Sequence, residues 1–212
     1  KMKILFVHGM GATRFDFYPN SYRLRKLGYT TSALSYFASF QTLDSIRKRL
    51  RHQLEEIAAE GDYAVVGHSL GGVLLREALL SLPLAVHQPK HLFLLGSPIV
   101  ATRANTFLST YAMYSLMFGQ CGQLVASPER MRAIGLPAIP TTCVVGTKPF
   151  PGRFSLLGKE PNDGIVLESE LCLALFSDVV RISATHPLLP SSAHLSGIIH
   201  KRLASESSVI PA

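Results

Sequence analysis

A serine flanked by glycines is the residue of this sequence best suited to nucleophilic chemistry. The segment Gly67-His68-Ser69-Leu70-Gly71 follows the pattern G-x-S-x-G. Glycines on either side of the serine let a strand and a helix pack closely around a sharp turn, so that the hydroxyl projects from the edge of a sheet. A hydroxyl in that position can attack a carbonyl carbon. Because the pattern is short, the alternative is a glycine-rich turn with no chemistry.

A serine nucleophile needs a general base and an acid that orients this base, and both candidates come later in the chain. Asp163 stands in Asn162-Asp163-Gly164 after a predicted strand, where the alternative is an ordinary Asp-Gly turn. His186 directly follows the last predicted strand, from which a loop histidine can reach over the sheet edge. His194 is the alternative base, although it would lie on the first turn of the closing helix. Asp178 opens the last strand and would lie at the opposite end of the sheet.

Two backbone N–H groups are candidates for binding the negative charge that develops on an attacked carbonyl oxygen. The segment His8-Gly9-Met10-Gly11 directly follows a predicted buried strand, and its glycines allow the backbone to turn toward the sheet edge. The N–H groups of Met10 and Leu70 would then form an oxyanion hole beside Ser69, with an ordinary loop as the alternative. His8 itself is interpreted as a structural hydrogen-bonding residue and not as the base.

Apolar runs and helical stripes predict the elements that would position these residues. Short apolar runs predict six strands, over residues 4–7, 30–37, 63–66, 91–95, 140–146 and 178–185. Apolar residues at spacings of three and four predict helices, over residues 18–27, 43–57, 73–79 and 191–203. Strands that alternate with helices favour a mostly parallel sheet with helices on both faces. Residues 204–212 are expected to be a frayed tail.

The stretch from Ala104 to Pro128 contains no charged residue. Its large apolar side chains would line one side of a helix, namely Phe107, Leu108, Tyr111, Tyr114, Met117 and Phe118. Serine, threonine, asparagine, glutamine and glycine are too frequent there for a membrane span. Two interpretations stay open. The stretch is either a core helix packed on the sheet or, within residues 99–139, an apolar wall or small cap that contacts an acyl chain.

Composition and charge bear on the class of protein. Apolar residues make up 47% of the chain and the net charge is +7, so the chain is globular rather than disordered. No basic motif interleaved with aromatic residues indicates nucleic-acid binding. The basic face formed by Arg47, Lys48, Arg49 and Arg51 is interpreted as a solvated helix face, with transient contact to membrane head groups as the alternative.

The cysteines and the first residues bear on the compartment. Three distant cysteines without a C-x-x-C pattern favour a reduced compartment and argue against zinc or a disulfide framework. No signal peptide is visible, because the first apolar run is short and leads directly into a functional loop. A cytoplasmic location is therefore expected, with a processed secreted form as the alternative. The oligomeric state stays open.

Several of these segments resemble those of a known family. Val7–Phe17 and Gly67–Gly72 resemble the oxyanion loop and the nucleophile elbow of small, lidless bacterial lipases in the α/β-hydrolase superfamily. Asn162–Val166 is similar to the acid segment of such enzymes, and the residues that follow His186 are similar to the segment that carries their base. The resemblance covers most of the chain. It departs at Ile99–Ala101, where many lipase-like hydrolases have a histidine and a glycine.

The resemblance implies one minimal α/β-hydrolase domain over residues 1–212, with the first two of about six strands exchanged in the order 2-1-3-4-5-6. It implies a serine hydrolase that cleaves carboxylic esters with an apolar acyl group, whether small molecules or lipids. Ser69, Asp163 and His186 would form the triad, in the chain order of this fold and without a metal or cofactor. A thioesterase, an amidase or an acyltransferase would use the same groups. A non-catalytic binding protein with the same fold is a further alternative.

Overall fold

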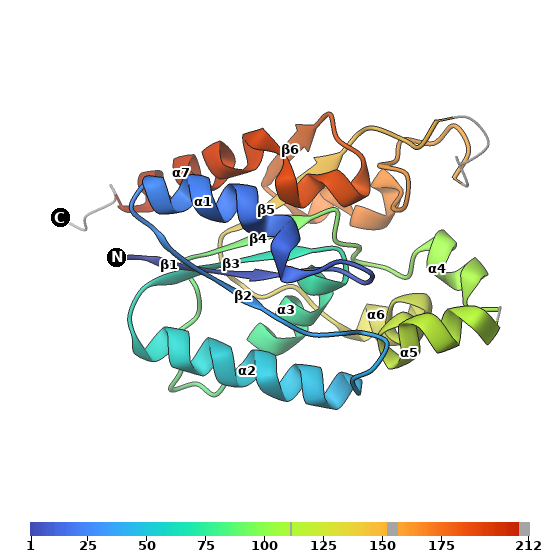
Figure 1. Cartoon of the computed structure of the whole chain (residues 1–212), viewed down its shortest axis with the longest axis horizontal. Helices are drawn as coiled ribbons and strands as arrows, with labels where there is room; N and C mark the ends of the chain where they lie inside the picture. The colour runs from blue at the N-terminus through green and yellow to red at the C-terminus, as the bar shows by residue number, and fades with distance from the viewer. Residues whose placement is uncertain (111, 152–156, 208–212) are drawn as a thin grey trace.

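Six parallel strands form one sheet in the computed structural model (Figure 1), which describes residues 1–110, 112–151 and 157–207. The strands are β1 (Lys3–Val7), β2 (Thr30–Leu34), β3 (Tyr63–His68), β4 (His91–Leu95), β5 (Thr141–Gly146) and β6 (Asp178–Ile182). Their order is β2-β1-β3-β4-β5-β6, so the predicted exchange of the first two strands is confirmed. Every neighbouring pair is parallel. The carboxyl ends of the strands therefore lie at one edge, where open parallel sheets bind their ligands.

Alternation along the central strands divides the core into two layers. The layers are covered by α1 (Tyr18–Lys26), α2 (Leu43–Ala59), α3 (Leu70–Leu80) and α7 (Ala193–Ser207). On β1, Ile4 and Phe6 belong to the core layer under α1 and α7, whereas Leu5 and Val7 belong to the layer under α2 and α3. Figure 1 shows the two pairs of helices on opposite faces of the sheet. The predicted covering of both faces is therefore confirmed.

The basic face of α2 is largely engaged in local ion pairs. Arg47 donates from Nε to the Glu77 carboxylate on α3 at 2.7 Å and also donates to its second oxygen. Two further pairs lie within α2, between Lys48 and Asp44 and between Arg51 and Glu55. Such pairing is expected of a solvated helix face, and contact with a membrane stays a prediction.

The prediction of one helix across the uncharged stretch is wrong. The chain forms α4 (Arg103–Leu108), then α5 (Ala112–Ala126), which is interrupted at Gly119, and then α6 (Pro128–Ala133). α4 ends at Leu108, and beyond it Ser109 Oγ and Thr110 Oγ1 donate to the carbonyls of Thr106 and Phe107. Phe107 is exposed on α4. Tyr111 and the side chains of Tyr114 and Met117 lie outside the described residues.

The end of the chain also differs from the prediction. β6 stops at Ile182, because its last partner is Gly146 at the end of β5. His186 therefore does not follow the strand directly: three residues intervene, and His186 begins a 3₁₀ helix, His186–Ser191. Residues 204–207 belong to α7 and not to a frayed tail, and residues 208–212 lie outside the described part. Among the described residues, no helix combines the length and apolarity needed to cross a bilayer.

Candidate active site

Ser69 lies on a sharp turn between β3 and α3, which is the context that its motif requires. Its backbone has φ +52° and ψ −122°, a conformation that costs a residue with a side chain about 1–3 kcal/mol. The turn is held in place because the Ser69 N–H donates to the Leu95 carbonyl at 2.9 Å. Only glycine fits at Gly71, where a Cβ would lie 2.1 Å from the Val7 carbonyl oxygen. The surrounding strands thus impose the conformation of Ser69.

Asp163 and His186 form a buried hydrogen-bonded pair at the same edge of the sheet. His186 Nδ1 lies 2.6 Å from Asp163 Oδ2, and the two side chains are 5% and 3% exposed. The other oxygen, Oδ1, accepts from the N–H groups of Ile165 at 3.1 Å and Val166 at 2.8 Å. Because an ionised carboxylate only accepts hydrogen bonds, the Asp163 contact places the proton on Nδ1 and leaves Nε2 of His186 with a lone pair.

His194 has a different environment. It is exposed on the first turn of α7, where the sequence predicted it. Both oxygens of Asp163 already have partners, and the His186 backbone N–H donates to the Asp163 carbonyl at 2.8 Å. The structure therefore brings His186, and not His194, to the predicted acid.

The loop after β1 approaches Ser69 closely enough to supply an oxyanion donor. A Cβ at Gly9 would lie 2.9 Å from Ser69 Cβ, so the backbone of this loop lies against the serine. Met10 follows Gly9, and Leu70 opens α3, where the first N–H groups lack a partner within the helix. Within the described part of the chain, neither the Met10 nor the Leu70 N–H has a hydrogen-bond acceptor. Both are therefore free to bind an anionic oxygen.

Comparison with known proteins identifies the fold. A scan against protein-family models and a search of curated proteins both find no match. Solved structures match over nearly the whole chain. A putative hydrolase of the α/β superfamily from Xanthomonas campestris aligns with 97% of this chain and 99% of its own, with a TM-score of 0.63 and 14% identity. The chain has the α/β-hydrolase fold.

Two further matches to the α/β-hydrolase fold carry more specific names. The RedJ thioesterase from the prodiginine biosynthetic pathway in Streptomyces coelicolor aligns over 97% of this chain and 90% of its own, with a TM-score of 0.59 and 16% identity. The methylesterase MES16 from Arabidopsis aligns over 97% of this chain and 100% of its own, with a TM-score of 0.60 and 14% identity. At such low identity these similarities concern the fold.

In the α/β-hydrolase fold a nucleophile, an acid and a base come in this order along the chain. Here Ser69 follows β3, Asp163 lies in the loop after β5 and His186 comes after β6. Asp178, at the amino end of β6, is bound instead by Arg202 at 2.8 Å and 2.9 Å. Among the described residues, no group of three His, Cys, Asp or Glu side chains is arranged to hold a metal ion.

His8 and its neighbours support the loop after β1. The His8 ring stacks on Tyr36 with centroids 4.2 Å apart, and its Nδ1 lies 2.9 Å from the Gly9 carbonyl oxygen. Tyr36 in turn donates to the His8 carbonyl at 2.6 Å. Burial lowers the pKa of His8, which favours the neutral ring. These contacts agree with the predicted structural role of His8.

His68 is a residue of the site that the sequence analysis missed. Its ring is buried beside the His186 ring, with centroids 4.6 Å apart, and its Nε2 lies 3.0 Å from the His186 carbonyl oxygen. Because a carbonyl only accepts, Nε2 must donate, and it thereby holds the backbone of the candidate base. The signal available in the sequence was its place directly before Ser69, where β3 carries it to the same edge.

We expect the free energy of unfolding to decrease as the pH falls below about 6.5. Burial, reinforced by the nearby His186, holds the pKa of His68 well below its ordinary value. Below about pH 6.5 the unfolded chain therefore binds a proton at His68 that the folded protein does not bind. The free energy of unfolding consequently rises with pH up to that value. The change is at most about 1.4 kcal/mol per pH unit for one group.

Urea denaturation at several pH values between about 5 and 8 measures this effect. His68→Gln keeps a donor for the His186 carbonyl but removes the titrating ring, so we expect it to flatten the pH dependence. Some slope should remain, because His8 also has a lowered pKa. An unchanged slope in His68→Gln would show that His68 is not kept neutral by the fold.

Proposed function

We propose that this protein is a serine hydrolase that cleaves carboxylic esters with an apolar acyl group through an acyl-enzyme intermediate. The observation that carries the proposal is the buried hydrogen bond between His186 and Asp163, at the sheet edge where the strained Ser69 directly precedes α3. Strain of this kind persists where the surrounding structure imposes it, and it is concentrated at active sites. The α/β-hydrolase fold of the chain supports the same conclusion as an analogy.

The proposed reaction begins with proton transfer from Ser69 Oγ to His186 Nε2 as the serine oxygen attacks the ester carbonyl carbon. Asp163 stabilises the imidazolium through its bond to Nδ1. The oxyanion accepts hydrogen bonds from the N–H groups of Met10 and Leu70, each worth about 10²–10³ in rate. The imidazolium then protonates the departing alcohol. Water, activated by Nε2, attacks the acyl-enzyme and releases the acid and Ser69.

The position of residues 99–139 supports the proposal that the acyl group of the substrate is apolar. Its helices α4, α5 and α6 lie beyond the carboxyl ends of the strands (Figure 1), where the candidate site lies. Phe107 on α4 is 61% exposed there, and an exposed aromatic side chain beside a site is suited to contact with an apolar chain. We propose that this segment serves as the wall of the acyl site, without a lid that must open.

A panel of p-nitrophenyl esters from acetate to palmitate, with matched thioesters, tests the substrate class. We expect kcat/KM to rise as the acyl chain lengthens beyond acetate, because each additional buried methylene contributes about 0.8 kcal/mol. Without a mobile lid, the rate should follow the dissolved ester and show no abrupt rise at the solubility limit.

Three results would change this proposal. An abrupt rise at the solubility limit would indicate that residues 104–128 form a mobile lid. A preference for short, charged acyl groups would contradict an apolar wall. Faster turnover of thioesters than of the matched esters would assign the protein to the thioesterases. RedJ, one of the structural neighbours, is named as a thioesterase.

A further inference from the structure

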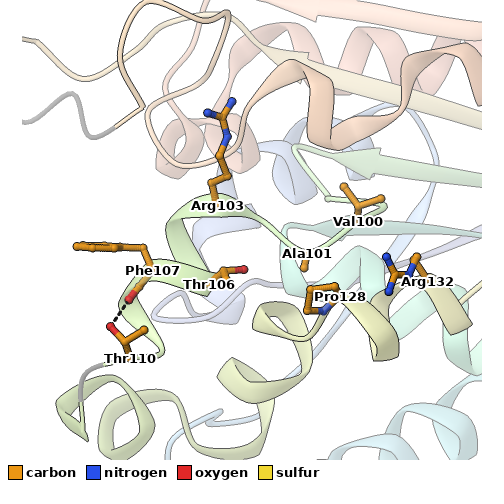
Figure 2. A pocket seen from close by; sticks show the side chains of 8 residues that line it. All are labelled: Val100, Ala101, Arg103, Thr106, Phe107, Thr110, Pro128 and Arg132. Carbon is orange, nitrogen blue, oxygen red and sulfur yellow. Dashed lines mark hydrogen bonds between the residues drawn. The ribbon is translucent and has the colours of Figure 1, made fainter.

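A pocket of about 530 Å³ lies between the loop after β4 and the helices α4 and α6. It is lined by Val100, Ala101, Arg103, Thr106, Phe107, Thr110, Pro128 and Arg132. Its volume is within the range of small-molecule sites, about 300–1,000 Å³. Figure 2 shows Phe107 and Thr110 on one side and Pro128 and Arg132 on the other, with Arg103 pointing away from them. The pocket is thus mainly apolar, with a cation on one side.

The walls of this pocket are fixed to the helix that follows the nucleophile. Arg76 on α3 is fully buried. Its Nη1 donates to the Pro98 carbonyl and its Nη2 to the Ile134 carbonyl, both at 3.2 Å. Pro98 precedes the pocket loop, and Ile134 follows α6. The Arg76 side chain therefore fixes the loop after β4 and the end of α6 to α3, which begins directly after Ser69.

The opposite wall, α4, is fixed to the segment that carries the candidate acid. The carboxylate of Glu170 is buried and accepts from the Arg103 N–H at 2.6 Å and the Leu167 N–H at 2.9 Å. Thr102, which is also buried, caps α4 by accepting from the Asn105 N–H at 3.2 Å. The pocket is therefore held by buried hydrogen bonds on both sides, which is the preorganisation that a binding site needs.

The pocket lies within reach of the candidate catalytic pair. A Cβ at Gly96 would lie 3.0 Å from both Asp163 Oδ2 and His186 Nδ1, so the end of β4 lies against this pair. Val100 comes four residues later, and four extended residues span at most about 14 Å. The lining of the pocket therefore begins no more than about 14 Å from the end of β4, a distance that an extended substrate chain of comparable length spans.

Arg132 contributes a positive charge to the lining of the pocket. Arg103 is neutralised by Glu160, with 2.5 Å between its Nη2 and Oε1. In the part of the chain that the structure describes, the Arg132 guanidinium has no ion-pair or hydrogen-bond partner, even though Glu129 lies one turn before it on α6. A guanidinium without a partner at the side of an apolar pocket is suited to a carboxylate, which it can bind with two parallel hydrogen bonds.

We infer that this pocket binds a substrate acyl chain that ends in a carboxylate, with the chain on Val100, Ala101 and Phe107 and the carboxylate on Arg132. The inference rests on the proposed hydrolase function for the position of the ester. It narrows the substrate class from apolar acyl esters to esters whose acyl chain carries an acidic group at its far end.

Direct binding to the Ser69→Ala protein tests the pocket without requiring catalysis. The probes are monomethyl suberate and methyl octanoate, which share the ester end and chain length and differ in the carboxylate at the far end. We expect isothermal titration calorimetry to show about five- to tenfold tighter binding of monomethyl suberate, because hydrogen bonds to charged groups are among the stronger ones. The preference should shrink at high salt.

Two arginine variants locate the source of the preference. Arg132→Gln should remove it, whereas Arg130→Gln should retain it, because Arg130 is on the same helix but lines a different cavity. Phe107→Ser, at an exposed position, should weaken both probes alike. Equal binding of the two probes, or an equal effect of Arg130→Gln and Arg132→Gln, would overturn the inference.

The proposed function is tested separately by covalent labelling of Ser69 in the unsubstituted protein. If Ser69 is labelled but monomethyl suberate is not preferred, the hydrolase proposal stands and the charge-selective pocket is refuted. If monomethyl suberate is preferred but Ser69 is not labelled, the pocket stands as a ligand site and the hydrolase proposal is refuted.

Discussion

Ser69→Ala is expected to lower kcat for ester hydrolysis by about 10⁶-fold, because it removes the atom that forms the covalent intermediate. The same variant should no longer react with a fluorophosphonate probe, which bonds to an activated serine. Intact-protein mass spectrometry measures the labelling directly. The fold should be unaffected, since alanine is smaller than serine and the strained turn is imposed by the contacts around it.

Ser97→Ala is the matched control for this experiment. Ser97 follows β4 at the same edge of the sheet, and its buried Oγ has no hydrogen-bond partner within the described residues. Its removal should therefore leave both labelling and turnover close to those of the parent. Labelling that persists in Ser69→Ala would disprove the assignment of the nucleophile.

His186→Ala is expected to lower kcat by about 10⁴–10⁶-fold, with a much smaller change in KM. The reason is that the variant loses the group whose Nε2 would accept the Ser69 proton, while the proposed substrate pocket is unchanged. It also leaves Asp163 with one oxygen lacking a partner inside the protein. Steady-state kinetics on one soluble ester separates kcat from KM.

His194→Ala should stay within about tenfold of the parent enzyme, because His194 is exposed on α7. Circular dichroism of both variants controls for loss of fold. Should His194→Ala prove the more damaging change, the base would be His194, and the contact between His186 and Asp163 would have to be a structural one.

Local sequence signals predicted the elements that carry the candidate site. Apolar runs bounded by glycine located β3 and β5, and helical spacing located α2 and α3, because each of these signals is contained within one element. Ser69, Asp163 and His186 were selected in the order that the fold requires, and the structure brings the last two into contact. Their catalytic roles stay predictions.

Features that depend on distant parts of the chain were not predicted. The contact of His68 with His186 joins segments far apart in the sequence, and the residues around either histidine do not indicate that contact. The end of β6 depends on where its neighbour β5 stops. The break after α4, where the Ser109 and Thr110 hydroxyls donate to its last carbonyls, interrupts a stretch whose apolar spacing favoured one helix. The role of the buried Arg76 was not predicted either, because its two partners, the carbonyls of Pro98 and Ile134, lie far along the chain.

The parallel order of the sheet also affects when the site forms during folding. Each parallel pairing needs a crossover connection, and contacts between distant segments form slowly. Close to half of the chain separates Ser69 from Asp163, and His186 follows β6, the edge strand that lies beside β5 in the sheet. A chain in which β6 has not yet docked would contain the Ser69 turn without its base. Reactivity of Ser69 toward a covalent probe should therefore report completed folding, and it should appear later in refolding than the secondary structure.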